Sequence, residues 1–341
     1  MRTVSVEQSA GLVLCHDITE IVPGVCKHPA FRRGYRVKEE DIPHLLRLGK
    51  KNLFVWDGPE PGLVHEDDAA CRIALKIAGP GIDYGAPKEG RINFTASRHG
   101  LLRVDLDLLR LLNSVPDMAI ATAHTMQEVH AGNVVAGERV IPLTVREENV
   151  AAVEQHCRER GPLLEVLPFK EFRVGIISTG SEVHAGLIQD GFGPVLRKKV
   201  ANWGSTVISH EIVPDETSAT VAALEKTLAA GADMILVTGG MSVDPDDKTP
   251  AAIRALGCDV VVYGAPVFPG AMFMLGYKGE VPVFGLPGCV MYHHASILDL
   301  VMPRILAGLR VTAQDIVDLA HGGLCLGCEV CHYPNCVFGK G

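Results

Sequence analysis

Between residues 173 and 306, short β-branched runs alternate with stretches of helical length, and this alternation limits the fold more than any other feature. Strands that alternate with helices predict βαβ units and a mostly parallel sheet. Because the strands are apolar throughout, both faces of the sheet should be covered. The predicted fold class is therefore α/β with three layers. The runs are 173–178, 206–209, 234–237 and 259–262, with a predicted hairpin of 272–277 and 281–284.

Local signals predict where two later helices begin. Thr249 precedes Pro250, which suits a capping residue followed by proline at the first helical position. After Pro287 and Gly288, a single helix is predicted to run through Leu306.

Three glycine-containing loops follow strands of the predicted sheet. In an open parallel sheet such loops share one edge, where ligands bind. Glycine lets the backbone approach a ligand, and the helices behind the loops direct free N–H groups at it. The loops therefore predict one site for an anionic ligand. They comprise residues 178–182, 238–243 and 286–289.

The second loop continues into a cluster of acids, Asp244, Asp246 and Asp247, close to Ser242. Oxygen ligands of this kind suit Mg²⁺ held against a phosphate. The alternative is a solvated acidic loop before the helix at Thr249. Because the cluster lies on the predicted ligand edge, the sequence favours metal binding.

Several classes of protein are disfavoured. No loop matches the dinucleotide-binding or P-loop signature, and the G-x-S-x-G elbow of serine hydrolases does not occur. A net charge of −8 without a basic block disfavours nucleic acid and membrane surfaces as partners. With no apolar leader and no run of about 18 apolar residues, we expect a cytoplasmic protein without a membrane span.

The loop 238–243, followed by acids, resembles the signature loop of the molybdopterin-binding domain. Residues 179–182 look like the first loop of that domain and residues 286–288 like its last, in the same order and spacing. The resemblance covers about residues 172–311 and includes molybdopterin molybdenumtransferases of the MoeA and gephyrin E-domain type. It implies molybdopterin or its adenylylated form as ligand, with Mg²⁺ and molybdate as reaction partners.

The resemblance also implies roles for individual residues. Asp247 corresponds to an acid that handles the metal and Glu182 to the acid of the first loop; with Asp244 they form the predicted catalytic set. The Mg²⁺ ligands predicted from the acidic cluster are Asp244, Asp246 and Asp247. The implied cofactor-binding residues are Thr179, Gly180, Ser181, Thr238, Gly239, Gly240, Ser242, Pro287 and Gly288.

The chain departs from the family pattern at three places: the first loop, the proline–glycine turn at Pro269 and Gly270, and the last loop. Ser181 stands where an aspartate is usual, Ala271 where a lysine follows the proline–glycine turn, and Cys289 with Val290 where Asn-Pro is usual. Pterin binding tolerates these losses better than molybdate insertion does. Extra carboxylates on the second loop are candidates to replace the lost acid.

The leading hypothesis is a molybdopterin molybdenumtransferase-like enzyme of molybdenum-cofactor biosynthesis, which positions its substrates and stabilises charge with Mg²⁺. The missing residues favour an alternative, a non-catalytic molybdopterin carrier that supplies molybdoenzymes. A third hypothesis is an adenylyltransferase-like activity. A homodimer is expected by analogy with the family.

The predicted domains are a small α+β part at 1–86, a middle region at 87–169, the molybdopterin-binding domain at 170–312 and a cysteine-rich tail at 313–341. Residues 1–169 look like a shortened, mixed α/β relative of the transferase's N-terminal part. In the middle region, residues 140–145 are predicted to form an edge strand because of Pro142. No function is assigned to His124 and His130, since no third ligand follows at metal spacing.

The tail contains Cys325, Cys328, Cys331 and Cys336, with His332 among them. Four thiols this close can hold Zn²⁺, and their first spacings are similar to ferredoxin runs that hold a [4Fe–4S] cluster. The alternative is a mobile, thiol-rich tail. Neighbouring thiolates repel unless they are protonated or share a metal, so the sequence favours a metal or cluster.

Overall fold

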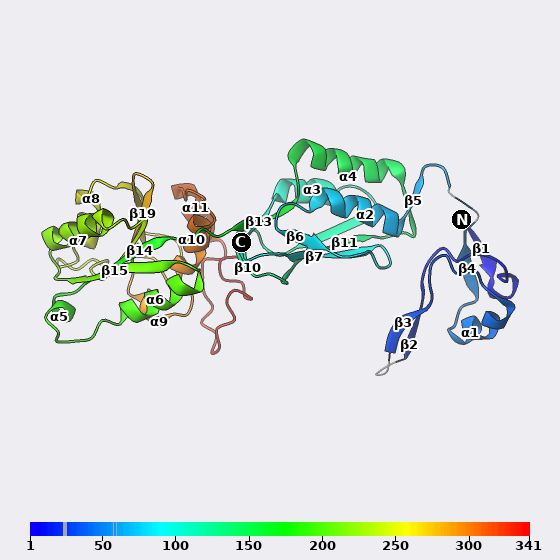
Figure 1. Cartoon of the computed structure of the whole chain (residues 1–341), viewed down its shortest axis with the longest axis horizontal. Coiled ribbons are helices and arrows are strands. Elements are labelled where there is room, and N and C mark those ends of the chain that lie inside the picture. The colour runs from blue at the N-terminus through cyan, green and yellow to red at the C-terminus, as the bar shows by residue number, and fades with distance from the viewer. Residues whose placement is uncertain (23–25, 57, 59) are drawn as a thin grey trace. The chain divides into compact units, whose positions relative to one another are not determined.

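A computed structural model describes residues 1–22, 26–56, 58 and 60–341. These residues form two compact units (Figure 1). Unit 1 comprises Met1–Ser97, Val104–Thr125 and Gly132–Glu165, and unit 2 comprises Arg98–Arg103, Met126–Ala131 and Val166–Gly341. No helix within the described ranges is long and apolar enough to cross a membrane.

Unit 2 is built on a six-stranded sheet with the strand order β15-β14-β16-β19-β18-β17. The neighbours β15, β14, β16 and β19 are parallel, whereas β18 is antiparallel to both β19 and β17. The predicted mostly parallel sheet and its hairpin are therefore confirmed. The strands are β14 (Arg173–Thr179), β15 (Thr206–Val213), β16 (Met234–Thr238), β17 (Asp259–Tyr263), β18 (Met274–Lys278) and β19 (Val281–Leu286).

Helices cover both faces of this sheet, as expected from its apolar strands (Figure 1). Successive residues of a strand point to opposite faces. Accordingly, Ile176 and Leu236 pack in one core with α6 and α10, and Ile177 and Val237 pack in the other with α7 and α8. The helices are α5 (Ser181–His184), α6 (Phe192–Asn202), α7 (Thr217–Ala229), α8 (Thr249–Ala255), α9 (Cys289–Tyr292), α10 (Ile297–Leu306) and α11 (Ala313–Val317), followed by the 3₁₀ turn η3 (Asp318–Ala320).

Two predicted helix boundaries are wrong. The helix expected from Pro287 through Leu306 is broken into α9 and α10, because Ser296 is extended and caps α10 in a capping box with Asp299. Thr249 is not the cap of α8 but its first residue; its hydroxyl donates to the carbonyl of Gly239 instead, over 2.8 Å.

A second, three-stranded sheet of order β10-β8-β13 lies mostly in unit 2. Its strands are β8 (Gly100–Val104), β10 (Gln127–Val129) and β13 (Leu164–Pro168). The pair β8 and β10 is antiparallel, with Val129 opposite Gly100.

Unit 1 contains a four-stranded antiparallel sheet of order β6-β7-β11-β9, against which α2 packs. The predicted edge strand at 140–145 is wrong, because Val140 ends β11 and β12 begins only at Thr144. The elements are β1 (Arg2–Ser5), η1 (Val6–Gln8), β2 (Ile18–Val22), β3 (Cys26–Phe31), η2 (Glu39–Asp41), α1 (Ile42–Arg47), β4 (Asn52–Val55), β5 (Leu63–His65), α2 (Glu66–Ile77), β6 (Ile82–Tyr84), β7 (Arg91–Ala96), α3 (Leu106–Asn113), β9 (Met118–Thr122), β11 (Val134–Val140), β12 (Thr144–Arg146) and α4 (Glu147–Arg160).

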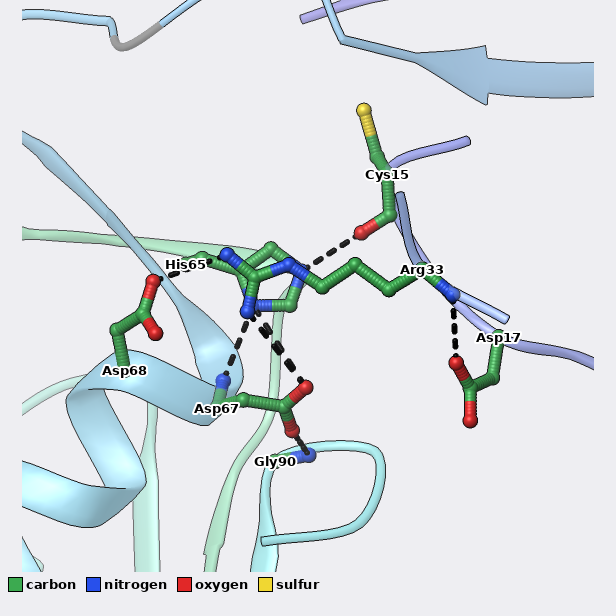
Figure 2. A network of polar contacts seen from close by, with 7 residues as sticks. All are labelled: Cys15, Asp17, Arg33, His65, Asp67, Asp68 and Gly90. Atoms are coloured by element: carbon green, nitrogen blue, oxygen red, sulfur yellow. Dashed lines mark hydrogen bonds and ion pairs between the residues drawn. The ribbon is translucent and has the colours of Figure 1, made fainter. Parts of the chain in front are cut away.

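A polar network at the start of α2 ties distant parts of unit 1 together (Figure 2). Arg33 pairs with Asp68 at 3.0 Å and with Asp67 at 3.8 Å. His65 accepts the N–H of Asp67 at Nδ1 and donates from Nε2 to the carbonyl of Cys15, which requires a neutral ring. Burial lowers the pKa of His65 in keeping with that state.

Among the acids of unit 1, Glu138 on β11 has the pKa that is shifted furthest from its usual value. Its side chain is buried, and among the described residues neither of its carboxylate oxygens has a hydrogen-bond partner. Burial raises its pKa to about 9, so the folded protein holds this group protonated at neutral pH. The folded form binds the proton more tightly than the unfolded chain, and the associated stability is lost as the pH rises toward 9.

Glu138→Gln should therefore flatten the pH dependence of stability. The free energy of unfolding of the native protein should fall between pH 6 and pH 9 by at least about 1 kcal/mol more than that of the variant. Urea denaturation at both pH values measures the difference. The exposed Glu171→Gln serves as control, and equal slopes in native protein and Glu138→Gln would contradict the assignment.

Candidate functional site

The loops that follow β14 and β16 border a pocket of about 530 Å³. Because parallel strands end at the same edge of a sheet, segments far apart in the chain meet there. Residues from the connection between α5 and α6 and from the end of α9 complete the walls. The predicted site residues that line the pocket are Thr179, Gly180, Glu182, Gly239, Gly240, Asp244, Asp246 and Asp247.

Other predicted site residues lie outside the lining. Thr238 is fully buried, and its hydroxyl donates to the hydroxyl of Ser178 over 3.4 Å. Pro287 and Gly288 lead into α9, whose Met291 and Tyr292 line the pocket in their place. The remaining two are Ser181 and Ser242.

The first glycine loop is held to the loop that follows β15. The N–H of Gly180 donates to the carbonyl of Val213 over 3.0 Å. The N–H of Ser181 donates to the carboxylate of Asp215 over 2.8 Å, and the Ser181 hydroxyl accepts the N–H of Asp215 over 3.2 Å. Asp215 thus fixes the loop and also lines the pocket.

The second glycine loop packs directly on the first. Gly239 has φ +82°, and a Cβ at this position would lie 2.2 Å from the carbonyl oxygen of Thr179. The N–H of Thr249 donates to the carbonyl of Gly240 over 3.2 Å. Only glycine allows both the positive φ and the close contact. This explains why the signature loop has glycine at position 239.

Carboxylates dominate the charge of the pocket. Glu182, Asp190, Asp215, Asp244, Asp246 and Asp247 line it, whereas no lysine or arginine of the described residues does. Asp244 and Asp247 shape their own loop: the N–H of Asp244 donates to the Asp247 carboxylate over 2.9 Å, and the N–H of Asp246 donates to the Asp244 carboxylate over 3.0 Å. Oxygen donors of this kind match a hard divalent cation such as Mg²⁺.

A mostly buried polar cluster forms part of the pocket wall, to which Ser178 and Asp190 belong. Nε2 of His210 lies 3.2 Å from the carboxylate of Asp190 and 3.0 Å from the hydroxyl of Ser178. Asp190 also accepts the N–H groups of Phe192 and Gly193 at the start of α6. Burial lowers the pKa of His210, although Asp190 acts in the opposite direction. The site therefore keeps this imidazole neutral at neutral pH.

Sequence reasoning missed Asp190, His210 and Asp215. Asp215 had a usable signal, because it follows β15 at the same edge as the glycine loops. Asp190 and His210 had none, since their pairing depends on the packing of α6 beside β15.

The cysteine-rich tail packs on the rest of unit 2, to which it belongs. The N–H of Cys325 donates to the carbonyl of Phe268 over 2.8 Å, the hydroxyl of Tyr333 donates to the carbonyl of Asp299 over 3.0 Å, and Phe338 is buried. The four tail cysteines line a cavity of about 360 Å³. Within the described chain, no three of their sulfur atoms lie within 4.8 Å of one another.

Comparison with known families finds a match for most of unit 2. Residues 175–307 match the family described as a probable molybdopterin binding domain. This match confirms the resemblance predicted from the glycine loops. Residues 3–57 match a domain family of unknown function.

Three relatives named for molybdopterin chemistry are similar in sequence to this chain. A molybdopterin molybdenumtransferase of Bacillus subtilis is 28% identical over 301 residues, 84% of this chain and 65% of the relative. One from Synechococcus elongatus is 28% identical over 134 residues, 36% of this chain and 33% of the relative. A molybdopterin adenylyltransferase of Pyrococcus furiosus is 27% identical over 153 residues, 40% of this chain and 85% of the relative. The chain thus spans less than two thirds of either transferase.

Replacing Gly239 tests the contact between the two loops. Gly186→Ala is the control, because Gly186 also has positive φ (+73°) but open space around it. The control should cost about 1–2 kcal/mol of unfolding free energy. Gly239→Ala should cost at least about 1 kcal/mol more, because the new methyl meets a backbone oxygen. Urea denaturation measures both, and equal losses would contradict the close packing.

Proposed function

We propose that unit 2 binds a phosphorylated pterin of the molybdenum-cofactor class through a divalent cation, and that the protein acts in molybdenum-cofactor biosynthesis. The supporting observation is the pocket at the loop ends of the family domain, lined by six carboxylates and by no lysine or arginine. Carboxylates alone repel an anion. A phosphate therefore enters this pocket only together with a cation.

The chain's own residues have separate roles in this proposal. Asp244, Asp246 and Asp247, which line the pocket, hold Mg²⁺, for which their carboxylate oxygens are suitable donors. Mg²⁺ neutralises phosphate charge and polarises the bound oxygens. Gly180, Gly239 and Gly240 present backbone to the ligand without side chains in the way. Glu182, with Asp244 and Asp247, completes the proposed catalytic set.

The reaction proposed is molybdenumtransferase-like, with molybdopterin or its adenylylated form and molybdate as substrates. The protein's contribution is to orient them against the acidic edge. A carrier without turnover is the second candidate, and the absence of lysine and arginine from the pocket lining favours it. An adenylyltransferase-like activity is the third. A homodimer, a cytoplasmic location and molybdoenzyme partners stay predictions.

Release of AMP separates the first two candidates. With adenylylated molybdopterin, Mg²⁺ and molybdate, the transferase should release AMP as molybdate is inserted, whereas a carrier should bind without turnover. Quantifying AMP and pterin-bound molybdenum over time distinguishes them.

Asp247→Asn tests the cation more directly. The variant keeps the shape of the loop but removes one charge, so Mg²⁺-dependent affinity for adenylylated molybdopterin should fall at least about tenfold, or 1.4 kcal/mol. Asp259→Asn is the matched control, because Asp259 starts β17 at the opposite edge of the sheet. Calorimetric titration with and without Mg²⁺ measures both. Affinity that is independent of Mg²⁺ and of Asp247 would refute this proposal.

We further propose that Cys325, Cys328, Cys331 and Cys336 take up Zn²⁺ or an iron–sulfur cluster. Their sulfurs share one cavity without converging, so uptake requires the segment to close around the metal. Protein purified anaerobically should carry stoichiometric zinc or iron, and Cys328→Ser with Cys331→Ser should lose it. The exposed Cys71→Ser is the control. Elemental analysis that finds neither metal would remove the proposal.

A further inference from the structure

A second group of ligand-type side chains lies away from the acidic pocket, on the small sheet of unit 2. The antiparallel register places Val129 opposite Gly100 and Glu128 opposite Leu101. The next pair along the ladder is therefore His130 opposite His99. Because side chains alternate along a strand, Glu128 and His130 lie on the same face, which they share with His99.

The three side chains converge at one point. Nε2 of His99 lies 2.7 Å from Oε1 of Glu128, and Nε2 of His130 lies 3.9 Å from the same oxygen. The two imidazole rings stack at 4.3 Å with an interplanar angle of 18°. One donor atom from each residue lies within 4.8 Å of the other two, and no other such group of His, Cys, Asp or Glu occurs in the described part of the chain.

Neighbouring aromatic residues orient this group. The indole N–H of Trp203 donates to Oε2 of Glu128 over 3.3 Å, which leaves Oε1 directed at the histidines. The ring of Phe169 meets the ring of His99 edge-on at 4.8 Å. A partner that fixes the second oxygen of a carboxylate is typical of the outer shell of metal sites.

The group opens onto a cavity. Glu128 and His130 line a space of about 780 Å³ in unit 2, which Lys198 and Asn202 also border. The side chain of Glu128 is 17% exposed and that of His130 65% exposed. A ligand bound here thus contacts side chains of the small sheet and can be reached from the cavity.

We propose that His99, Glu128 and His130 bind one divalent transition-metal ion, of which Zn²⁺ is the reference case. Two imidazole nitrogens and one carboxylate oxygen form a known three-ligand set for such ions, with a further position open to water or substrate. Mg²⁺ disfavours nitrogen ligands, so this site differs in chemistry from the acidic pocket. It also uses none of the residues proposed to bind the pterin.

Co²⁺ is the probe that separates this site from the others. In the full chain carrying Cys328→Ser and Cys331→Ser to remove the tail site, and with excess Mg²⁺ to fill the acidic pocket, Co²⁺ should bind at nitrogen and oxygen ligands and give no thiolate-to-metal charge-transfer band. In a Trp56→Phe background Trp203 is the remaining tryptophan. Because Trp203 contacts Glu128, bound Co²⁺ should quench its fluorescence.

The affinity for Co²⁺, measured from the quenching of Trp203 fluorescence, should fall more than about tenfold in each of three variants. These are His99→Ala, Glu128→Gln and His130→Ala. His124→Ala is the matched control, because His124 is an exposed histidine outside the group. His130 is mostly exposed, so its removal keeps the test valid if the other variants unfold. The proposal is overturned if Co²⁺ leaves Trp203 fluorescence unchanged, or if His130→Ala binds Co²⁺ like the native protein.

Discussion

Mutual repulsion of carboxylates at one edge of a parallel sheet is the constraint on which the site depends. Glu182, Asp215 and Asp247 come from segments after three different strands, and the fold brings them to the same pocket. No lysine or arginine of that lining offsets their charge. The loops nevertheless stay in place through hydrogen bonds between side chains and backbone, chiefly from the N–H of Ser181 to the Asp215 carboxylate and from the Thr249 hydroxyl to the carbonyl of Gly239. The architecture thus holds charges together that favour a divalent cation.

The sequence was sufficient to predict this edge, because it depends on local signals. Apolar strand runs and glycine turns predicted the sheet, its two covered faces and the first two loops. Features set by tertiary packing were not predictable in the same way: the pairing of Asp190 with His210 and the burial of Glu138 arise between distant segments. The capping box of Ser296 and Asp299 was present in the sequence, but the apolar periodicity around it concealed the break.

Three cavities of unit 2 meet around the end of α9. Tyr292 lines the acidic pocket, the cavity of the tail cysteines and the cavity beside His130, and the residue is 78% exposed. Each cavity offers a different ligand chemistry: hard carboxylate oxygens, thiols, and imidazole with carboxylate. The short α9 and the extended residues after it therefore form a wall that the three cavities share. A continuous helix from Pro287 to Leu306 would have removed this shared wall.

The proposed function depends above all on a divalent cation at the acids beside the glycine loops. Mn²⁺ replaces Mg²⁺ at oxygen sites and broadens the NMR signals of nearby nuclei. Titration of isotopically labelled protein with substoichiometric Mn²⁺ should broaden the amide signals of Gly180, Gly239 and Gly240 first, and excess Mg²⁺ should restore them. If those three signals stay sharp while amides elsewhere in unit 2 broaden, the cation binds at another place and the account is wrong.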